Sequence, residues 1–201
     1  MTESFNTGPF NAVVLAGGTA ARLDGVDKGS VEHRGRTLLT WALDSVIDAG
    51  EVVVVGDPVP TERPVTFVRE SPRHGGPVAA MLTGRDALLR ERPWLAVLAC
   101  DMPYLTPATF RRLREASSGR DGAALFGPDG RRQLVFVVSA AALDGVRPGH
   151  EEQHGAALQP LMAQLDLADV ASVGDEHRDI DTWSDLRDLL PPDESGDTVD
   201  V

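Results

Sequence analysis

A glycine pair followed by two cations is the segment of this sequence best suited to chemistry. The apolar run at 13–16 stops at Gly17-Gly18, and Arg22 and Lys28 follow within ten residues. Glycine lets the backbone approach an anion because it has no Cβ, and successive N–H groups in such a turn form an anion-binding concavity. A nucleoside triphosphate needs this combination. An ordinary strand-to-helix turn with surface cations is the alternative that the segment alone leaves open.

Two aspartates are candidate metal ligands. Asp101 follows the apolar run Leu95–Ala99 after only one residue, so we expect it to leave a buried strand directly into a cleft. An ionised carboxylate there needs a partner or a metal, and Mg²⁺ is typically held by one or two carboxylates plus substrate phosphates. The alternative is a strand-end Asp that caps the next helix. Asp181 either caps the last predicted helix or turns toward the same metal.

Two other patterns are interpreted as structural. The stretch His150-Glu151-Glu152-Gln153-His154 matches the zinc-protease pattern H-E-x-x-H. Pro148-Gly149 before it and Gly155 after it, however, predict a loop instead of the helix that this motif requires. Cys100 stands beside Asp101, whose carboxylate opposes formation of a thiolate. We therefore expect neither a zinc hydrolase nor a cysteine nucleophile.

The elements that must position these residues alternate between β-rich apolar runs and helical patterns, which predicts an α/β fold with three layers. The expected strands are Asn11–Ala16, Glu51–Val55, Val65–Val68, Leu95–Ala99, Gly122–Phe126, Gln133–Val138 and Val170–Val173. The expected helices are Thr37–Ala49, Gly76–Arg90, Pro107–Ala116, Ser139–Gly145, Ala156–Gln164 and Thr182–Leu190.

The strand ends predict where the chemistry gathers, because ligands of open α/β sheets bind outside the carboxyl ends of the strands. Glu70 follows the third predicted strand and leads into Gly75-Gly76-Pro77. Asp101 follows the fourth. Together with the Gly17-Gly18 loop, these strand ends bring glycines, cations and carboxylates to one edge of the sheet. The sequence therefore predicts a site for Mg²⁺ and a triphosphate at that edge.

Composition restricts the class of protein. The chain has 201 residues, of which 42% are hydrophobic, and this fits one globular domain at 11–190 between a flexible N-terminus at 1–10 and a disordered tail at 191–201. The net charge of −12 argues against a nucleic-acid partner, which needs a basic face. One cysteine excludes an internal disulfide, and no apolar stretch approaches the ~18 residues of a membrane span. We expect a cytoplasmic protein with no membrane partner.

The sequence resembles the molybdenum cofactor guanylyltransferases over roughly residues 11–190. The segments that carry the resemblance are Leu15-Ala16-Gly17-Gly18-x-x-x-Arg22-x-x-Gly25-x-Asp27-Lys28, Gly76-Pro77, Cys100-Asp101-Met102-Pro103-Tyr104-Leu105 and Asp181-Thr182-x-x-Asp185-Leu186. The resemblance implies the three-layer α/β/α, Rossmann-like fold of nucleotidyltransferases, with a mostly parallel sheet. It also implies a nucleotide half at about 11–105 and an acceptor half at about 106–190.

The resemblance implies an enzyme that uses GTP and Mg²⁺ to attach GMP to the phosphate of molybdopterin, releasing pyrophosphate. Molybdoenzymes or their chaperones are the implied protein partners. The implied catalytic residues are Lys28, Arg22 and Asp101, and the implied metal ligands are Asp101 and Asp181. The implied nucleotide-binding residues are Leu15, Ala16, Gly17, Gly18, Arg22, Lys28, Glu70, Gly76, Pro77 and Asp101.

Two alternatives stay open at this point. One is a related nucleotidyltransferase that uses CTP or another phosphorylated acceptor. The other is a nucleotide-binding regulator without turnover. The acceptor half leaves this choice open because it carries few cations: only Arg147 and Arg178 occur between residue 145 and the last predicted helix.

Overall fold

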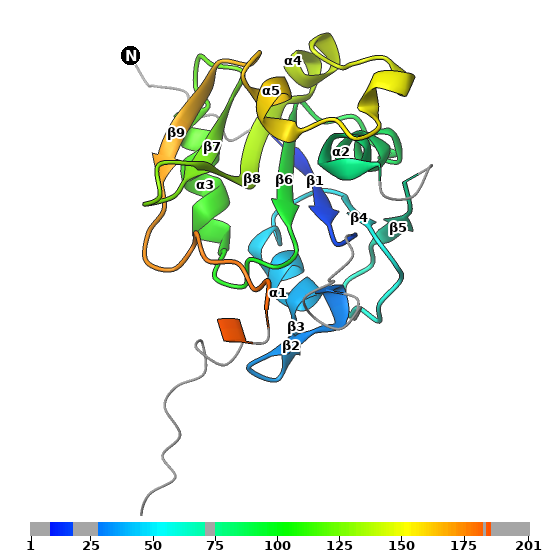
Figure 1. The fold of residues 1–201 in the computed structure, drawn as a ribbon, viewed down its shortest axis with the longest axis vertical. Coiled ribbons are helices and arrows are strands. Elements are labelled where there is room, and N and C mark those ends of the chain that lie inside the picture. The colour runs from blue at the N-terminus through cyan, green and yellow to red at the C-terminus, as the bar shows by residue number, and fades with distance from the viewer. Residues whose placement is uncertain (1–8, 18–27, 71–74, 183, 186–201) are drawn as a thin grey trace, which may run out of the picture.

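The computed structural model describes residues 9–17, 28–70, 75–182 and 184–185 (Figure 1). Its strands are β1 (Phe10–Leu15), β2 (Glu32–His33), β3 (Arg36–Thr37), β4 (Val52–Val55), β5 (Thr66–Val68), β6 (Trp94–Ala99), β7 (Gly122–Phe126), β8 (Arg132–Ser139) and β9 (Leu167–Ala171). Its α-helices are α1 (Leu38–Ser45), α2 (Gly76–Asp86), α3 (Pro107–Ala116), α4 (Ala140–Gly145) and α5 (Leu158–Met162). Two 3₁₀ turns are η2 (Lys28–Ser30) and η3 (His150–Gln153).

Seven strands form one mixed sheet in the order β5-β4-β1-β6-β8-β7-β9. Four of its six strand pairings are parallel, whereas β8 runs antiparallel to both β6 and β7. Because Leu98 pairs with Val135 and Phe126 pairs with Arg132, β8 starts at the edge where β6 and β7 end. This edge also holds the end of β1. The edge is called the site edge below.

Helices cover both faces of the sheet and make three layers (Figure 1). Alternate residues of β1 enter the two cores: Phe10, Ala12 and Val14 face α1 and α3, whereas Val13 and Leu15 face α2, α4 and α5. Every residue of β1 and β4 is buried, which is the reason why β4 is continuously apolar and β1 is apolar except for Asn11. The fold is the three-layer α/β/α arrangement that the sequence predicts.

Helix α2 lies unusually close to the centre of the sheet. A Cβ on Gly84 would stand 2.5 Å from Cγ1 of Val13 and 2.9 Å from Cγ2 of Val55. Only a glycine leaves room for the helix at this crossing. The approach brings Gly76 and Pro77, at the start of α2, to the site edge.

Most predicted helices and strands are present, but several begin or end at other residues than predicted. Helix α2 stops at Asp86 instead of Arg90, and α5 is limited to Leu158–Met162. The last strand is wrong in position, because β9 covers Leu167–Ala171 and not Val170–Val173. The hairpin β2–β3 was not predicted. The predicted helix at 182–190 lies mostly outside the described residues.

Among the residues that the structure describes, no helix has both the length and the apolar character that crossing a bilayer requires.

Candidate functional site

A cavity of about 370 Å³ opens at the site edge, beyond the ends of β1 and β6. It lies between these strand ends and the start of α2, so apolar side chains form its floor and charged groups its rim. Leu134, near the start of β8, is on its far wall. The lining residues are Leu15, Gly17, Lys28, Glu70, Gly76, Pro77, Ala80, Ala99, Cys100, Asp101 and Leu134.

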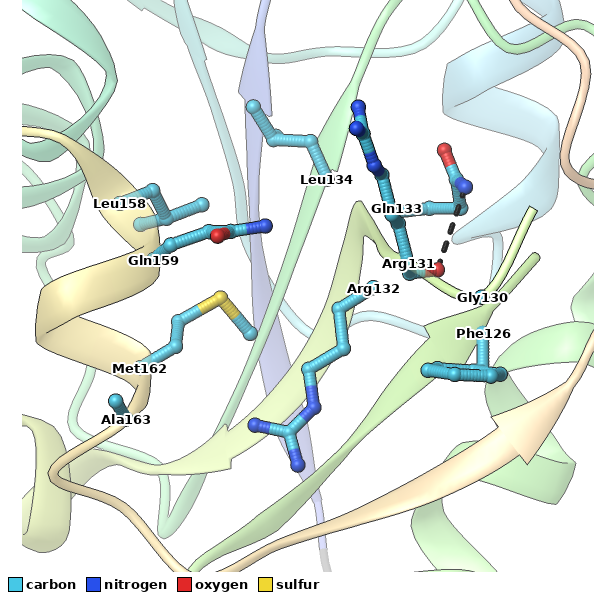
Figure 2. A pocket seen from close by; sticks show the side chains of 10 residues that line it. All are labelled: Phe126, Gly130, Arg131, Arg132, Gln133, Leu134, Leu158, Gln159, Met162 and Ala163. Carbon is cyan, nitrogen blue, oxygen red and sulfur yellow. Dashed lines mark hydrogen bonds between the residues drawn. The ribbon is translucent and has the colours of Figure 1, made fainter.

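A second cavity, of about 580 Å³, lies next to the first, and Leu134 lines both. Figure 2 shows it between helix α5 on one side and the start of β8, with the preceding turn, on the other. It is called the α5 cavity below. Its lining residues are Phe126, Gly130, Arg131, Arg132, Gln133, Leu134, Leu158, Gln159, Met162 and Ala163.

Lys28 joins two carboxylates at the rim of the first cavity. Its Nζ lies 2.7 Å from Oδ2 of Asp101 and 2.5 Å from Oδ1 of Asp181. The side chains of Lys28 and Asp101 are largely buried, with 18% and 15% of their surface exposed. Burial strengthens the Lys28–Asp101 pair, because water screens it less, whereas the side chain of Asp181 is 42% exposed.

Four charged groups influence one another here. Partial burial works against the charged form of Lys28, but Asp101 and Asp181 outweigh it and raise the pKa of the ammonium above its usual value. Asp179 stands close by. Burial, followed by repulsion from Asp181 and Asp101, raises the pKa of the Asp179 carboxyl. Negative charge is thus concentrated in excess of what Lys28 neutralises, which favours a second cation.

The carboxylates fit a hard divalent cation. Asp101 and Asp181 direct oxygen atoms at one point, where Nζ of Lys28 lies. Within the described residues, no group of three His, Cys, Asp or Glu side chains has the spacing of a complete protein cage for a metal. Mg²⁺ is typically held by one or two carboxylates together with substrate phosphates, and the pair Asp101 and Asp181 fits the protein part of such a site.

A small apolar cluster brings the three charged segments together. Val31, Leu38 and Ile180 are buried against one another, with Tyr104 packed on them. Val31 follows the turn that carries Lys28, Tyr104 follows Asp101 in the chain, and Ile180 precedes Asp181. The backbone N–H of Ile180 also donates to the carbonyl of Asp101 at 2.9 Å. The segments that carry Lys28, Asp101 and Asp181 are thus held together at the rim of the first cavity.

Asp181 faces Lys28 because other residues cap the turn that follows. The N–H of Asp185 donates to Oγ1 of Thr182 at 3.1 Å, and Oδ2 of Asp185 accepts from the N–H of Thr182 at 2.7 Å. This reciprocal pair is a capping box. Of the two arrangements that the sequence leaves open for Asp181, the structure therefore has the one that turns toward the site.

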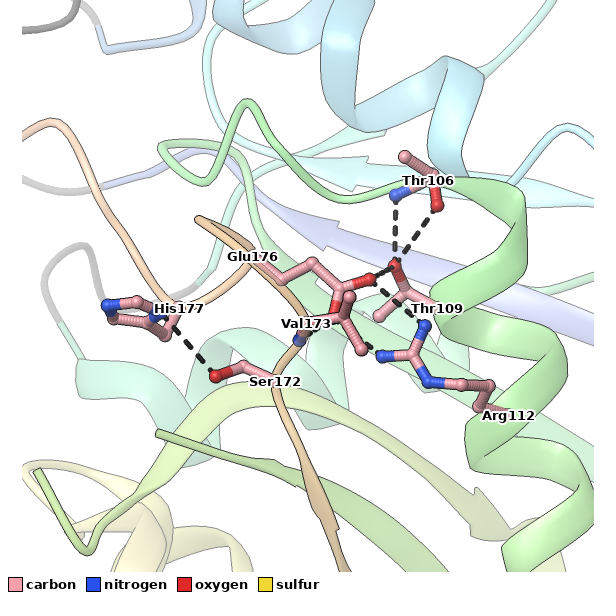
Figure 3. Close-up of polar contacts among 7 residues, drawn as sticks. All are labelled: Thr106, Thr109, Arg112, Ser172, Val173, Glu176 and His177. Carbon is pink, nitrogen blue, oxygen red and sulfur yellow. Dashed lines mark hydrogen bonds and ion pairs between the residues drawn. The ribbon is translucent and has the colours of Figure 1, made fainter. Parts of the chain in front are cut away.

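Glu176 anchors the segment that carries Asp179 and Asp181 onto helix α3 (Figure 3). Its carboxylate accepts hydrogen bonds from Oγ1 of Thr109 at 2.6 Å, from both terminal nitrogens of Arg112, and from the N–H of Val173 at 2.8 Å. Thr109 also accepts from the N–H of Thr106, the N-cap of α3. Burial opposes ionisation of Glu176, but the hydrogen bonds from Arg112 and Thr109 prevail and lower its pKa.

Glu70 and Gly76 line the part of the cavity wall at the start of α2. Oε1 of Glu70 accepts from the N–H of Gly75 at 3.2 Å, and the carbonyl of Gly75 accepts from the N–H of Gly155 at 2.7 Å. Gly76 has φ +87°, a conformation that a side chain rarely adopts. The start of α2 is therefore held by the loop before α5.

Seven of the ten predicted nucleotide-binding residues line the first cavity, and the exceptions are Ala16, Gly18 and Arg22. Ala16 lies in the core under α1 and α3. Gly18 and Arg22 lie outside the described residues. Sequence reasoning missed Leu134 as a site residue, although it lies in the predicted strand Gln133–Val138. It also missed Glu176, which no sequence signal marks in the charged segment at 175–178.

The predicted loop at 150–154 contains the 3₁₀ turn η3 instead of a long helix. His150 and His154 line a separate cavity of about 80 Å³ with Asp86 and Arg147, whose side chains form a two-point ion pair at 2.6 and 2.5 Å. This cavity lies behind α2. It shares no lining residue with the first cavity.

Comparison with known proteins gives one family and a set of relatives. A family model described as a MobA-like NTP transferase domain matches residues 12–170. A molybdenum cofactor guanylyltransferase of Shewanella loihica is 29% identical over 142 residues, which are 68% of this chain and 71% of that protein. One from Neisseria meningitidis serogroup C is 36% identical over 105 residues, which are 47% of this chain and 53% of that protein. The chain thus spans about half the length of the Neisseria relative.

Solved structures show the same fold at low identity. The Rv0371c protein of Mycobacterium tuberculosis has a TM-score of 0.71 at 22% identity, covering 91% of this chain and 97% of that one. The molybdopterin-guanine dinucleotide biosynthesis protein A of Archaeoglobus fulgidus has a TM-score of 0.63 at 19% identity, covering 89% and 96%. At these identities the likeness concerns the fold.

Proposed function

The chain belongs to the MobA-like NTP transferase domain family, and from this membership we propose that it transfers a nucleoside monophosphate from its triphosphate to a phosphorylated acceptor. The specific reaction that we propose is transfer of GMP from GTP to the phosphate of molybdopterin. The names of the guanylyltransferase relatives support this choice. The proposal includes a cytoplasmic location, and molybdoenzymes or their chaperones as recipients of the product.

One observation carries the proposal. Gly17, Lys28, Asp101 and the start of α2 line a single cavity at the site edge, and Lys28 and Asp101 are in contact there. A backbone loop, an ammonium and a carboxylate are the groups that a metal–triphosphate complex requires. Leu15 and Gly17, which line the cavity at the end of β1, are the proposed contacts on the nucleotide side.

The proposed reaction is a direct in-line displacement. An oxygen of the acceptor phosphate bonds to the α-phosphorus of GTP, the bond from that phosphorus to the bridging oxygen breaks, and the electron pair leaves with pyrophosphate. Positioning and charge stabilisation are the main contributions of a protein to such a step. Lys28 and Arg22 hold the leaving pyrophosphate. Asp101 and Asp181 would hold Mg²⁺, which when bound neutralises phosphate oxygens.

The proposal predicts selective stabilisation by one nucleotide. In a thermal-shift panel of GTP, CTP, ATP and UTP with Mg²⁺, we expect GTP at a hundred times its Kd to raise Tm by roughly 5–10 °C. A larger shift with CTP would replace the proposal by a cytidylyltransferase. The absence of a shift with all four would contradict it.

The proposal also predicts that Asp101→Asn abolishes turnover and preserves the fold. We expect a loss of about 100-fold or more in kcat for pyrophosphate release with GTP, Mg²⁺ and molybdopterin, because one charged group of the site is removed. Asp144→Asn is the matched control, since Asp144 lies on α4, at the opposite edge of the sheet, and pairs with Arg85 of α2. Full activity of Asp101→Asn would remove this residue from the site. Nucleotide binding without pyrophosphate release by the wild type would favour a regulator.

A further inference from the structure

The α5 cavity lies at the same edge of the sheet as the proposed nucleotide site. Strand β8 begins at this edge, because it runs antiparallel to β6, and the turn at 127–131 follows the end of β7 there. Leu134 lines both cavities. The α5 cavity therefore borders the proposed nucleotide site at Leu134.

The lining of the α5 cavity combines three kinds of group. Phe126, Leu158 and Met162 present apolar surface, and Gln159 presents an amide. Arginines supply the charge, and none of the described residues that line the cavity is acidic. This is unusual in a chain with a net charge of −12. Apolar walls with an amide suit a flat heterocycle whose edges form hydrogen bonds, and arginine suits a phosphate.

The two arginines are not equivalent. Arg132 is engaged, because its Nε donates to Oδ1 of Asp169 at 2.6 Å and a terminal nitrogen donates to the carbonyl of Leu167 at 3.0 Å. No such partner is recorded for the guanidinium of Arg131 among the described residues. Figure 2 shows Arg131 extending to the Leu134 side of the cavity and Arg132 extending the other way. Arg131 is thus the cation available to a ligand near the boundary of the two cavities.

We propose that the α5 cavity is the acceptor subsite, with the ring system of the acceptor between β8 and α5 and its phosphate at Arg131 beside Leu134. This inference rests on the proposed function, because it requires a phosphorylated acceptor. Arg131 would supply positive charge to the acceptor, for which the stretch after residue 145 offers few cations. The acceptor phosphate then enters the nucleotide site past Leu134, from the side of β8, in the cavity that Lys28 also lines.

Steady-state transfer from GTP to molybdopterin tests the inference. We expect Arg131→Ala to raise the KM for molybdopterin about tenfold, the value of one charged hydrogen bond, and to change the KM for GTP less than twofold. Arg131→Lys should restore part of the loss. Ala163→Phe should also raise the acceptor KM, because Ala163 is an exposed residue that lines the cavity and its replacement fills the space. Arg120→Ala is the control, since Arg120 precedes β7 at the opposite edge and pairs with Asp166.

The outcomes separate the two claims. If the wild type transfers no nucleotide to molybdopterin, the proposed function fails. If the wild type is active and either Arg131→Ala or Ala163→Phe leaves the acceptor KM unchanged, the acceptor subsite lies elsewhere. An equal rise in the KM for GTP would assign Arg131 to the nucleotide and would also overturn the inference.

Discussion

Lys28 neutralises two carboxylates and is also proposed to bind the triphosphate. The same ammonium therefore has to exchange partners when nucleotide and metal arrive together. The exchange is balanced, because Mg²⁺ replaces the positive charge that Asp101 and Asp181 lose and the phosphates replace the negative charge that Lys28 loses. Binding of metal and nucleotide should be cooperative for this reason.

Lys28→Met tests this coupling. We expect the affinity for GTP to fall about tenfold or more, because a charged hydrogen bond is lost. We also expect Mg²⁺ alone to raise the Tm of the variant more than that of the wild type, since Asp101 and Asp181 then repel each other with no ammonium between them. Titration calorimetry and thermal unfolding measure the two effects.

Arg36→Met is the control for Lys28→Met, because Arg36 forms an exposed ion pair with Asp44. It should leave both quantities unchanged. Equal stabilisation of wild type and Lys28→Met by Mg²⁺ would show that the ammonium and the metal do not share a place.

The individual site residues could be predicted where the chain itself marks them. Gly17, Glu70 and Asp101 each follow an apolar strand, so the rule that ligands gather at strand ends places them together. Glu176 could not be found in this way. Its contact with Thr109 joins residues 67 positions apart, and charged segments are usually solvated. A hydrogen bond of that kind exists only after the elements have packed.

Helix α3 connects the two acidic segments at the scale of elements. Thr109 bonds to Thr106, on the segment that follows Asp101, and to Glu176, on the segment that leads to Asp181. The first turn of α3 thus fixes the separation of the two proposed metal ligands. Glu176 is a positioning residue in this arrangement and touches no proposed substrate.

Glu176→Gln should weaken the fold in a pH-dependent way. The folded-state pKa of Glu176 lies below the usual 4.5, so its contribution is complete above the pKa of the unfolded chain and is lost as pH falls through the lower folded value. We expect the free energy of unfolding at pH 7 to drop by about 1.5–3 kcal/mol. The difference from wild type should shrink below pH 4.5. Urea unfolding at several pH values measures it.

Activity provides a second measure of the same variant. The Mg²⁺ concentration for half-maximal turnover should rise in Glu176→Gln, while GTP affinity without metal stays the same. Asp166→Asn is the control, because Asp166 forms an exposed pair with Arg120 and such pairs contribute little. An unchanged Mg²⁺ requirement would make Glu176 purely structural.

The contact between α2 and the sheet gives another prediction at this scale. Gly84→Ala should destabilise the protein by about 1–3 kcal/mol, because the new methyl group overlaps Val13 and Val55. Gly145→Ala is the matched control, since nothing lies within 4 Å of a Cβ at Gly145 on α4. Chemical denaturation of both variants measures the difference. Equal stabilities would mean that α2 moves away from the sheet at little cost.

The sequence predicts elements better than their ends. Helix α3 could be placed to the residue, because Thr106-Pro107 marks its start. The error at β9 arose because the pattern at 170–173 is short and its true partner, β7, is distant in the chain. The hairpin β2–β3 was missed because two-residue strands have no periodicity to detect.

The whole molecule combines two kinds of sheet. Parallel strands β5, β4, β1 and β6 carry the proposed nucleotide site, and the antiparallel pair β8–β7 carries the α5 cavity. Apolar patterns alone do not give strand direction, so the sequence predicts a mostly parallel sheet without locating the reversed strand. The turn residues Pro128-Asp129-Gly130 are typical of a hairpin and are the signal that would have located it.

The turn between Phe126 and Arg132 should tolerate insertions and substitutions better than the strand ends that line the proposed nucleotide site. Insertions in a hairpin turn extend a surface loop, and their entropic penalty grows only slowly with length. The segment after β6 lacks that freedom, since the carbonyl of Asp101 accepts from the N–H of Ile180 and helix α3 begins at Pro107. Diversification is therefore expected on the β7–β8 side. A library of turn lengths and sequences at 127–131 would be the natural starting point for engineering transfer to foreign acceptors, with the nucleotide-activating machinery left intact.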